Sequence, residues 1–370
     1  MRGIPSISTG SQQGVHMSRH QDQHSGCRGM FVPPQVIDQL SKNTTGDTRK
    51  AAIATAKESN ASRKQRAAKQ TPSAAAAPKA GAAMSKAPRT IYDCETQWNQ
   101  RVTIVRKEGQ KSVTDKDVNT TYDLAGTVRS FWQDEMGWDS IDNNGMELLL
   151  NVHYGTSYMN AFWDGDEMTF GDGDGQIFSG FCRSLDVIGH ELGHGVVQST
   201  AALEYHDQPG ALNEHYADVF GTAVTQWAAK QTPTTADWLI GDEIMGPTLY
   251  GEALRSMKAP GTAYNNGLIG RDPQPAHMSD FYSGAGDNGG VHINSGIMNK
   301  AFYLVASGLG DTVQACKLWF HALQSLTPTA DFSSAALTIA ESARLMTRDN
   351  ELPLGATQLV RSSFAQVGVV

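Results

Sequence analysis

The chain has 370 residues, of which 39% are hydrophobic and 18% are charged, and its formal net charge is −8 at pH 7. Its four cysteines are too few and too widely spaced for the disulfide framework of a small secreted domain. No apolar run is long enough to span a membrane, and residues 1–26 lack the apolar core of an ordinary secretion signal. We therefore expect a protein without a membrane span that is either exported by another route or acts inside the cell.

The first 88 residues differ sharply in charge from the rest of the chain. Residues 1–88 carry a net charge of +9, whereas residues 89–370 carry −17. Because the first region is poor in aromatic residues and rich in Ala, Ser, Gln and Lys, we expect it to be largely disordered or only conditionally folded, with a linker at residues 73–81. Residues 30–40 are an exception, because an apolar run and a Pro-Pro pair precede a short helix-like pattern.

The opposite charges of the two regions predict that they attract each other. The alternative is a basic tail that binds nucleic acid or a membrane surface. Such a tail would be expected to interleave arginine with aromatic residues, and this region does not. We therefore expect no nucleic-acid partner.

The region after residue 88 divides by its pattern into two parts. Residues 89–205 favour strands and end in an apolar helix, whereas helical patterns dominate residues 206–370. We therefore predict an α+β protein with a strand-rich N-terminal lobe and a mainly helical C-terminal lobe. A functional site is expected in the cleft between the lobes.

The helix that ends the first lobe contains His190-Glu191-Leu192-Gly193-His194. Two histidines four residues apart lie on one face of a helix, so their imidazoles can converge on one metal ion. Glu191 stands beside the first histidine and can reach a water molecule without being a ligand. Two neutral nitrogens, an adjacent carboxylate and an open coordination position are what zinc-assisted hydrolysis needs. The glycines of this helix weaken it and predict tight packing against another element.

A second helical pattern follows, with Glu214 and Asp218 again four residues apart. Zinc hydrolases often use two histidines and one glutamate, so Glu214 is the predicted third ligand. Ligating histidines usually donate their other N–H to an oxygen, and we assign Asp218 to the first histidine and Asn213 to the second. The alternatives are a solvated helix face, which the apolar residues of the helix disfavour, and His215 as a ligand. His215 points about 100° away from Glu214 around the helix.

Two later patterns supply further polar side chains. Arg255 offers a guanidinium that can bind a carbonyl or carboxylate group. In the glycine-rich run near residue 290, His292 could donate a hydrogen bond to an oxyanion, and Asp287 could orient and charge that ring. A single loop histidine often has no such role, so this interpretation depends on the other motifs.

Taken in order, the motifs resemble those of the thermolysin-like zinc metallopeptidases, a group of gluzincins. The resemblance covers roughly residues 89–370. It is carried by Asn160-Ala161-Phe162-Trp163, Gly171-Asp172-Gly173-Asp174-Gly175, His190-Glu191-Leu192-Gly193-His194, Gly210-Ala211-Leu212-Asn213-Glu214, Leu254-Arg255-Ser256-Met257, Asp287-Asn288-Gly289-Gly290-Val291-His292 and Phe364-Ala365-Gln366-Val367-Gly368-Val369. The compact catalytic region and Pro33-Pro34 are similar to the protealysin-like branch, whose short propeptide packs on the catalytic domain. The resemblance implies a precursor with residues 1–88 as propeptide and intramolecular inhibitor.

The resemblance also implies that the chain is a neutral endopeptidase acting on peptides through a metal-activated water. It assigns zinc binding to His190, His194 and Glu214, general base catalysis to Glu191, and oxyanion stabilisation to His292 and Tyr205, with Asp287 behind His292. It assigns substrate binding to Asn160, the backbone of Ala161, and Arg255. The pocket for the side chain after the scissile bond would be lined by Phe178, Val187, Ile240, Ile244 and Leu254. Because all five are apolar, we expect cleavage before Leu, Phe, Ile or Val.

A calcium site is less certain to be retained than the zinc site. Asp186, Asp237 and Asp242 match carboxylates of the paired calcium site of relatives, but Thr225 stands where a shared glutamate is expected. Calcium needs hard oxygen ligands, so we expect one weak calcium ion or none there. The loop that contains Asp172 and Asp174 is expected to form a turn.

Two other functions compete with an endopeptidase. An aminopeptidase would need a carboxylate that anchors a free amine, and none is evident, while the Asn160-Ala161 edge strand favours internal peptide bonds. A catalytically silent homologue could serve as a zinc-binding protein. This alternative is disfavoured because Glu191, Tyr205 and His292 occur together with all three predicted ligands.

Overall fold

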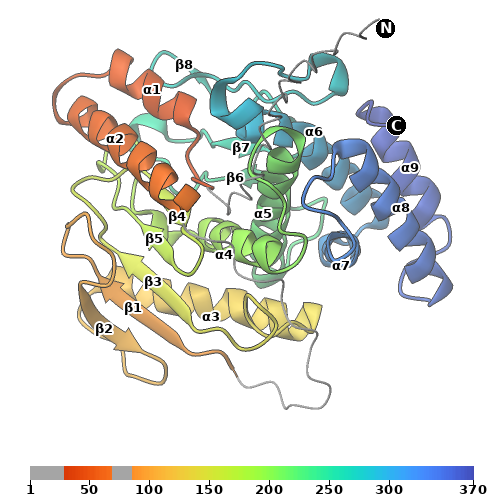
Figure 1. The fold of residues 1–370 in the computed structure, drawn as a ribbon, viewed down its shortest axis with the longest axis horizontal. Coiled ribbons are helices and arrows are strands. Elements are labelled where there is room, and N and C mark those ends of the chain that lie inside the picture. Colours follow the sequence, from red (N-terminus) through yellow and green to blue (C-terminus); the bar gives the residue numbers. More distant parts are fainter. Residues whose placement is uncertain (1–28, 69–85) are drawn as a thin grey trace, which may run out of the picture.

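The computed structural model describes residues 29–68 and 86–370 (Figure 1). Strands gather in the first part of the catalytic region and helices dominate the second, so the predicted α+β fold with two unlike lobes is confirmed. The linker expected at residues 73–81 lies outside the described residues.

Five strands form one mixed sheet in the order β2-β1-β3-β5-β4. Their bounds are Arg89–Asp93 (β1), Thr103–Lys107 (β2), Leu148–Val152 (β3), Ala161–Trp163 (β4) and Met168–Phe170 (β5). The pairs β1–β3 and β3–β5 are parallel, and the pairs β1–β2 and β4–β5 are antiparallel. Because β4 stands at the edge of the sheet, its outer backbone groups can bind another extended segment.

Helix α3 (Lys116–Met136) packs against β1 and β3 on one face of this sheet (Figure 1). Asp115 caps its N-terminus by accepting hydrogen bonds from the backbone N–H groups of Asp117 and Val118. Gly137 ends the helix in the left-handed conformation that favours glycine. The apolar face of α3 is buried in the core with the sheet.

Two central helices, α4 (Leu185–Ser199) and α5 (Asp207–Ala228), pack side by side (Figure 1). A Cβ atom at Gly189 would lie 2.7 Å from Val224 Cγ1, and one at Gly221 would lie 2.7 Å from the Asp186 carbonyl oxygen. Glycine therefore permits the close contact, which outweighs its helix-propensity cost of roughly 1 kcal/mol per residue. The tight packing predicted for α4 is confirmed.

The remaining helices and short strands complete the second lobe. They are β6 (Leu239–Ile240), η2 (Pro247–Leu249), β7 (Arg255–Ser256), β8 (Asn265–Asn266), β9 (Gly270–Arg271), η3 (Met278–Asp280), α6 (Gly286–Leu309), α7 (Thr312–Leu323), α8 (Phe332–Arg348) and α9 (Ala356–Gln366), while η1 (Phe181–Arg183) precedes α4 in the first lobe. Helices α6 and α7 pack against α5, and α8 and α9 lie outside them (Figure 1). Residues 287–290 have positive φ, so the regular part of α6 begins only after this turn.

Before the sheet, α1 (Pro34–Asn43) and α2 (Gly46–Ala68) form a helical hairpin (Figure 1). The short helix-like pattern noted within residues 30–40 thus corresponds to α1, whereas α2 differs from the disorder expected from composition. The reason is tertiary packing: α1 is polar on average, yet it buries Val36, Ile37 and Leu40 along one face. A short apolar stripe has little weight in composition but is enough to dock a helix.

Two further observations concern the cysteines and the apolarity of the helices. Cys94, Cys182 and Cys316 are buried free thiols, and Cys27 lies outside the described residues. Within residues 29–68 and 86–370, no helix combines the length and apolarity needed to cross a bilayer.

Candidate metal centre and substrate cleft

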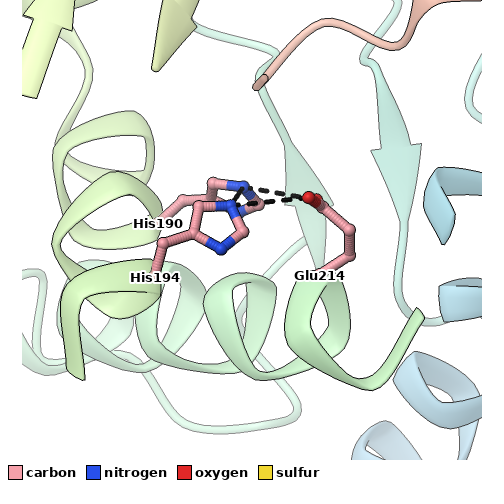
Figure 2. A group of neighbouring side chains, drawn as sticks. All are labelled: His190, His194 and Glu214. Atoms are coloured by element: carbon pink, nitrogen blue, oxygen red, sulfur yellow. Dashed lines mark hydrogen bonds and ion pairs between the residues drawn. The ribbon is translucent and has the colours of Figure 1, made fainter. Parts of the chain in front are cut away.

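Three buried side chains converge between α4 and α5 (Figure 2). The Nε2 atoms of His190 and His194 lie 3.0 Å apart. The Glu214 carboxylate faces both rings, with Oε2 3.5 Å from His190 Nε2 and Oε1 3.5 Å from His194 Nε2. The four-residue spacing in α4 thus places both imidazoles on the face that meets α5.

The other nitrogen of each ring faces an oxygen. His190 Nδ1 lies 2.9 Å from Asp218 Oδ1, and His194 Nδ1 lies 2.8 Å from Asn213 Oδ1. The Asn213 amide nitrogen donates to the Leu203 carbonyl, which fixes its oxygen toward the ring. Both Nδ1 atoms therefore carry hydrogen, and the Nε2 atoms face each other and a carboxylate. This arrangement requires a positive charge among the three groups, either a proton or a metal ion.

The two histidines differ in their electrostatics. Burial lowers the pKa of His194 to about 4, so this ring is neutral near pH 7. Burial alone would also lower the pKa of His190, but hydrogen bonds and charges from Asp218 and Glu214 raise it to about 9. The centre therefore attracts one positive charge. Two imidazole nitrogens and one carboxylate fit the ligand set of a zinc ion with an open position.

Asp218 connects the metal centre to a buried arginine. Its two oxygens accept hydrogen bonds from Arg255 Nη2 at 2.8 Å and Nε at 2.9 Å, and Oδ2 also accepts one from Asn299 at 2.9 Å. Burial would raise the pKa of Asp218, but the charges of Arg255 and His190 hold it well below its usual range. One carboxylate thus orients both a candidate ligand and Arg255, a link that the sequence does not reveal.

Tyr205 and His292 lie beside the centre. The Tyr205 hydroxyl donates a hydrogen bond to Glu214 and lies 3.4 Å from His292 Nε2. Asp287 holds His292 twice, because Oδ1 lies 2.7 Å from Nδ1 and Oδ2 accepts a 2.8 Å hydrogen bond from the backbone nitrogen. Burial opposes charge on this ring, but Asp287 and Glu214 raise its pKa. Glu191 is also fully buried, next to His190 on α4.

Three residues of the N-terminal region occupy the cleft along β4, and we call Met30, Phe31 and Val32 the inserted segment. The Phe31 backbone nitrogen donates to the Ala161 carbonyl at 3.1 Å. The Asn160 side chain binds both polar groups of Val32: its oxygen accepts from the backbone nitrogen at 2.8 Å, and its nitrogen donates to the carbonyl at 3.1 Å. The edge of the sheet, together with the Asn160 side chain, therefore holds the backbone of the inserted segment.

Two other site residues bind carbonyl groups of the inserted segment. Arg255 Nη1 donates to the Phe31 carbonyl at 3.0 Å. His292 Nε2 lies 2.8 Å from the Met30 carbonyl oxygen. Because a carbonyl oxygen only accepts, His292 Nε2 carries the hydrogen of this bond.

The Phe31 side chain fills a buried apolar pocket beside the metal centre. Its ring centroid lies 5.1 Å from that of His190, 6.5 Å from that of Phe181 and 5.0 Å from Arg255 Cζ. A Cβ atom at Gly241 would lie 3.0 Å from the Phe31 ring. The predicted pocket residues share one buried cluster with Phe31: Phe178, Val187, Ile240, Ile244 and Leu254. Sequence reasoning did not assign Phe181 or Phe31 to this pocket, although Phe31 lies in the apolar run recognised within residues 30–40.

The predicted calcium ligands lie around a small cavity of about 160 Å³ that Asp186, Asp237, Asp242, Glu243 and Thr225 help to line. Burial and the nearby charges of Asp186 and Asp237 raise the pKa of Asp242 to about 6. Among the described residues, no three of these carboxylates bring ligand oxygens within 4.8 Å of one another.

The geometry bears on two further predictions from the sequence. Both ring nitrogens of His215, the competing ligand, have other partners, because Asn299 Oδ1 lies 2.7 Å from its Nδ1 and Trp319 donates to its Nε2 at 2.7 Å. Asp174 caps a turn as expected, since its Oδ1 accepts hydrogen bonds from the backbone nitrogens of residues 176–178.

Comparison with known proteins agrees with this geometry. Residues 39–198 match the family model described as thermolysin metallopeptidase, catalytic domain, and residues 201–369 match thermolysin metallopeptidase, alpha-helical domain. The extracellular metalloprotease of Pectobacterium carotovorum subsp. carotovorum is 44% identical over 289 residues, which cover 77% of this chain and 82% of that protein. Protease PrtS of Photorhabdus sp. (strain Az29) is 44% identical over 270 residues, or 71% and 73% of the two chains.

A solved structure is similar over nearly the whole chain. It is the precursor of protealysin, a metalloproteinase from Serratia proteamaculans, with a TM-score of 0.81 and 39% sequence identity. The match covers 92% of this chain and 100% of that chain. It therefore includes part of the N-terminal region as well as the two lobes.

Proposed function

The chain belongs to the thermolysin family of zinc metallopeptidases, in its protealysin-like branch, and from this premise we propose which bonds it cuts, by which residues, and how it is held inactive. It is a zinc metalloendopeptidase. The proposed activity is hydrolysis of internal peptide bonds on the amino side of Leu, Phe, Ile or Val. The observation that carries this proposal is the Phe31 side chain in the apolar pocket beside His190, with its carbonyl bound by Arg255.

In the proposed mechanism, His190, His194 and Glu214 hold the zinc ion. When bound, zinc supplies Lewis acidity and brings the pKa of a water ligand toward about 7. Glu191 accepts a proton from the attacking water and passes it to the leaving nitrogen, a role that contributes roughly 10²–10⁴ in rate. Asp218 and Asn213 orient the two histidines, so that their Nε2 atoms stay directed at the centre.

The remaining residues act on the peptide. His292 and Tyr205 donate hydrogen bonds to the oxygen of the scissile carbonyl as it becomes an oxyanion, and Asp287 keeps His292 charged and oriented. Asn160, Ala161 and Arg255 align the peptide along β4. Alignment of this kind converts a bimolecular encounter into a reaction within a fixed complex.

We further propose that residues 1–88 form a propeptide, that residues 89–205 and 206–370 are the two catalytic lobes, and that the propeptide inhibits its own enzyme. The inserted segment supports this, since it binds Asn160, Ala161, Arg255 and His292, the groups that a substrate would need. The opposite net charges of the two regions favour their association.

For the acidic cavity we propose one weakly bound calcium ion or none. Thr225 supplies no carboxylate, and Asp186 is already engaged by the Gly241 backbone nitrogen at 2.6 Å. Glu243 likewise accepts a hydrogen bond from Ser184 at 3.0 Å. Each such bond would have to be rearranged for the oxygen to become a calcium ligand.

Digestion of an unstructured protein by the mature zinc-loaded enzyme tests the proposed specificity. Identification of the new N-termini by mass spectrometry should show Leu, Phe, Ile or Val at most of them. Predominant cuts before charged or small residues would contradict the assignment of the Phe31 pocket as the specificity pocket. The alternative of a silent zinc-binding homologue predicts no new N-termini at all.

A further inference from the structure

The inserted segment engages the cleft with a defined direction and register. Going along the chain, the Met30 carbonyl faces His292, the Phe31 nitrogen donates to Ala161, and the Phe31 carbonyl accepts from Arg255. Under the proposed function, His292 donates to the oxyanion and Ala161 lies on the edge strand. Arg255 binds the carbonyl of the residue after the scissile bond. Because the inserted segment makes all three of these contacts, the bond between Met30 and Phe31 lies where the scissile bond of a substrate would lie.

The side chains agree with the backbone. Phe31 occupies the apolar pocket assigned to the residue after the scissile bond. Met30 is fully buried in a separate aromatic cluster, where the Tyr158 hydroxyl lies 3.5 Å from its sulfur and Phe162 packs nearby. The side chains that flank this peptide bond are therefore seated in two different buried clusters.

The register cannot shift by one residue toward the C-terminus without losing a hydrogen bond. Asn160 Oδ1 accepts from the Val32 nitrogen at 2.8 Å, and the next nitrogen belongs to Pro33, which has no hydrogen to donate. A shift in the other direction would move α1 by about 3.3 Å along an extended chain. The burial of Val36, Ile37 and Leu40 opposes that movement.

Gly29, which precedes Met30, also packs closely against the active site. A Cβ atom at Gly29 would lie 2.3 Å from His194 Nε2, so the backbone of Gly29 passes directly against a predicted metal ligand. Only glycine has room at this position. The segment therefore runs beside the predicted ligand His194.

We propose that the Met30–Phe31 bond is a self-processing site, cut by the active site of the same molecule. This inference rests on the proposed function, and it is distinct from removal of the whole propeptide. The oxygen of a water molecule bonds to the Met30 carbonyl carbon, and the bond from that carbon to the Phe31 nitrogen breaks. Glu191 takes a proton from the water and gives it to the departing nitrogen. The second proton of the water also passes to that nitrogen, so one product ends with the carboxylate of Met30 and the other begins with the ammonium group of Phe31.

The consequence is a two-stage release. Hydrolysis detaches residues 1–30, while the new N-terminus at Phe31 remains joined to α1 and α2. That hairpin keeps its own contacts with the catalytic region, since Thr55 accepts from the Met159 nitrogen at 3.0 Å and Thr48 donates to Asp174 at 2.8 Å. Full activity then requires a later step that removes the hairpin.

The test follows the purified full-length chain after addition of zinc, by intact mass and N-terminal sequencing. We expect a fragment that ends at Met30 and a chain that begins at Phe31, with a first-order rate that is unchanged on tenfold dilution. Glu191→Gln should leave this bond intact. Phe31→Leu should still be cut, whereas Phe31→Ala should slow the cut by about tenfold or more because the pocket is no longer filled. Asp38→Ala, an exposed change on α1, is the matched control and should be cut like the wild type.

A parallel assay separates the two proposals. If the enzyme cleaves a quenched peptide with Leu after the scissile bond while Met30–Phe31 stays intact, the self-processing site is wrong and the proposed function stands. A rate that rises in proportion to protein concentration would also overturn it, since the cut would then occur between molecules. If Met30–Phe31 stays intact in the zinc-loaded full-length chain, and the enzyme freed of its propeptide by another protease does not cut the quenched peptide, both proposals fail.

Discussion

At the scale of single residues, Gly29 occupies a position with no room for a side chain. Because its added Cβ would lie 2.3 Å from His194 Nε2, Gly29→Ala should push the inserted segment out of place. Overpacking of this kind costs about 1–3 kcal/mol, so the uncut precursor should become roughly tenfold or more active on a quenched peptide. Initial rates measured alongside intact mass would check this, with Asp38→Ala as control. Unchanged activity of the Gly29→Ala precursor would show that the segment does not limit access.

The two carboxylates that hold histidines should differ in their effects when neutralised. Asp218→Asn weakens the orientation of His190, so zinc affinity should fall by roughly 10- to 100-fold. Asp287→Asn acts on His292, which is not a ligand, so kcat should fall by about 10²-fold or more with zinc content retained. Zinc titration and steady-state kinetics on both variants provide the comparison. Loss of zinc from Asp287→Asn would contradict this division of roles.

Most of the metal centre could be predicted from spacing alone, because ligands and their partners lie on two helices. The four-residue repeats of α4 and α5 place His190, His194 and Glu214 on facing sides. The occupant of the cleft could not be predicted in the same way. Phe31 reaches its pocket because its segment docks beside Arg255, which is 224 residues away in sequence. No local sequence pattern predicts a contact between residues so far apart.

At the scale of elements, His153 joins three parts of the first lobe. It follows β3 directly, its Nδ1 lies 2.9 Å from Asp172 in the loop after β5, and its Nε2 lies 3.2 Å from Asp115, the cap of α3. Asp117, which pairs with Arg183, completes its charged surroundings. Hydrogen bonding to Asp172 and the charges of both partners raise the pKa of His153 to about 9.

This raised pKa predicts a pH-dependent contribution to stability. Because the pKa of His153 in the folded protein lies above the ordinary histidine value of 6.5, the stabilisation is fully present below pH 6.5 and is lost as pH rises through about 9. His153→Gln should therefore lower the free energy of unfolding by on the order of 2 kcal/mol at pH 6 and by little at pH 10. Urea unfolding in a Glu191→Gln background, which prevents self-digestion, would measure it. An equal loss of unfolding free energy at pH 6 and pH 10 would indicate that His153 stabilises the fold by packing and not by its charge.

Elements with strong local signals were predicted well, and those that depend on docking were not. The glycines of α4 indicated close packing, and Gly189 indeed lies against α5. By contrast, α2 forms where composition favoured disorder. The order of this helix depends on its packing against α1 and on contacts such as that of Thr55 with Met159, which exist only in the folded chain.

At the scale of the whole molecule, covalent attachment explains how a short segment can block an enzyme. A tethered segment is present at a high effective concentration, so modest affinity keeps the cleft filled. Under the proposed inhibition, the five hydrogen bonds and one buried ring described above need to supply only that modest affinity. The order of the two lobes and their α+β character could be predicted from pattern, but the placement of the N-terminal hairpin over the substrate edge required the structure.

The central claim is that a zinc centre with Glu191 as general base hydrolyses peptides aligned along β4. The most direct measurement compares wild-type and Glu191→Gln enzyme, both freed of residues 1–88 by another protease, for zinc content and for cleavage of a quenched peptide with Leu after the scissile bond. We predict about one zinc ion per chain in both, and a loss of at least about 10²-fold in kcat for the variant. Retained activity in Glu191→Gln with zinc bound would contradict the mechanism.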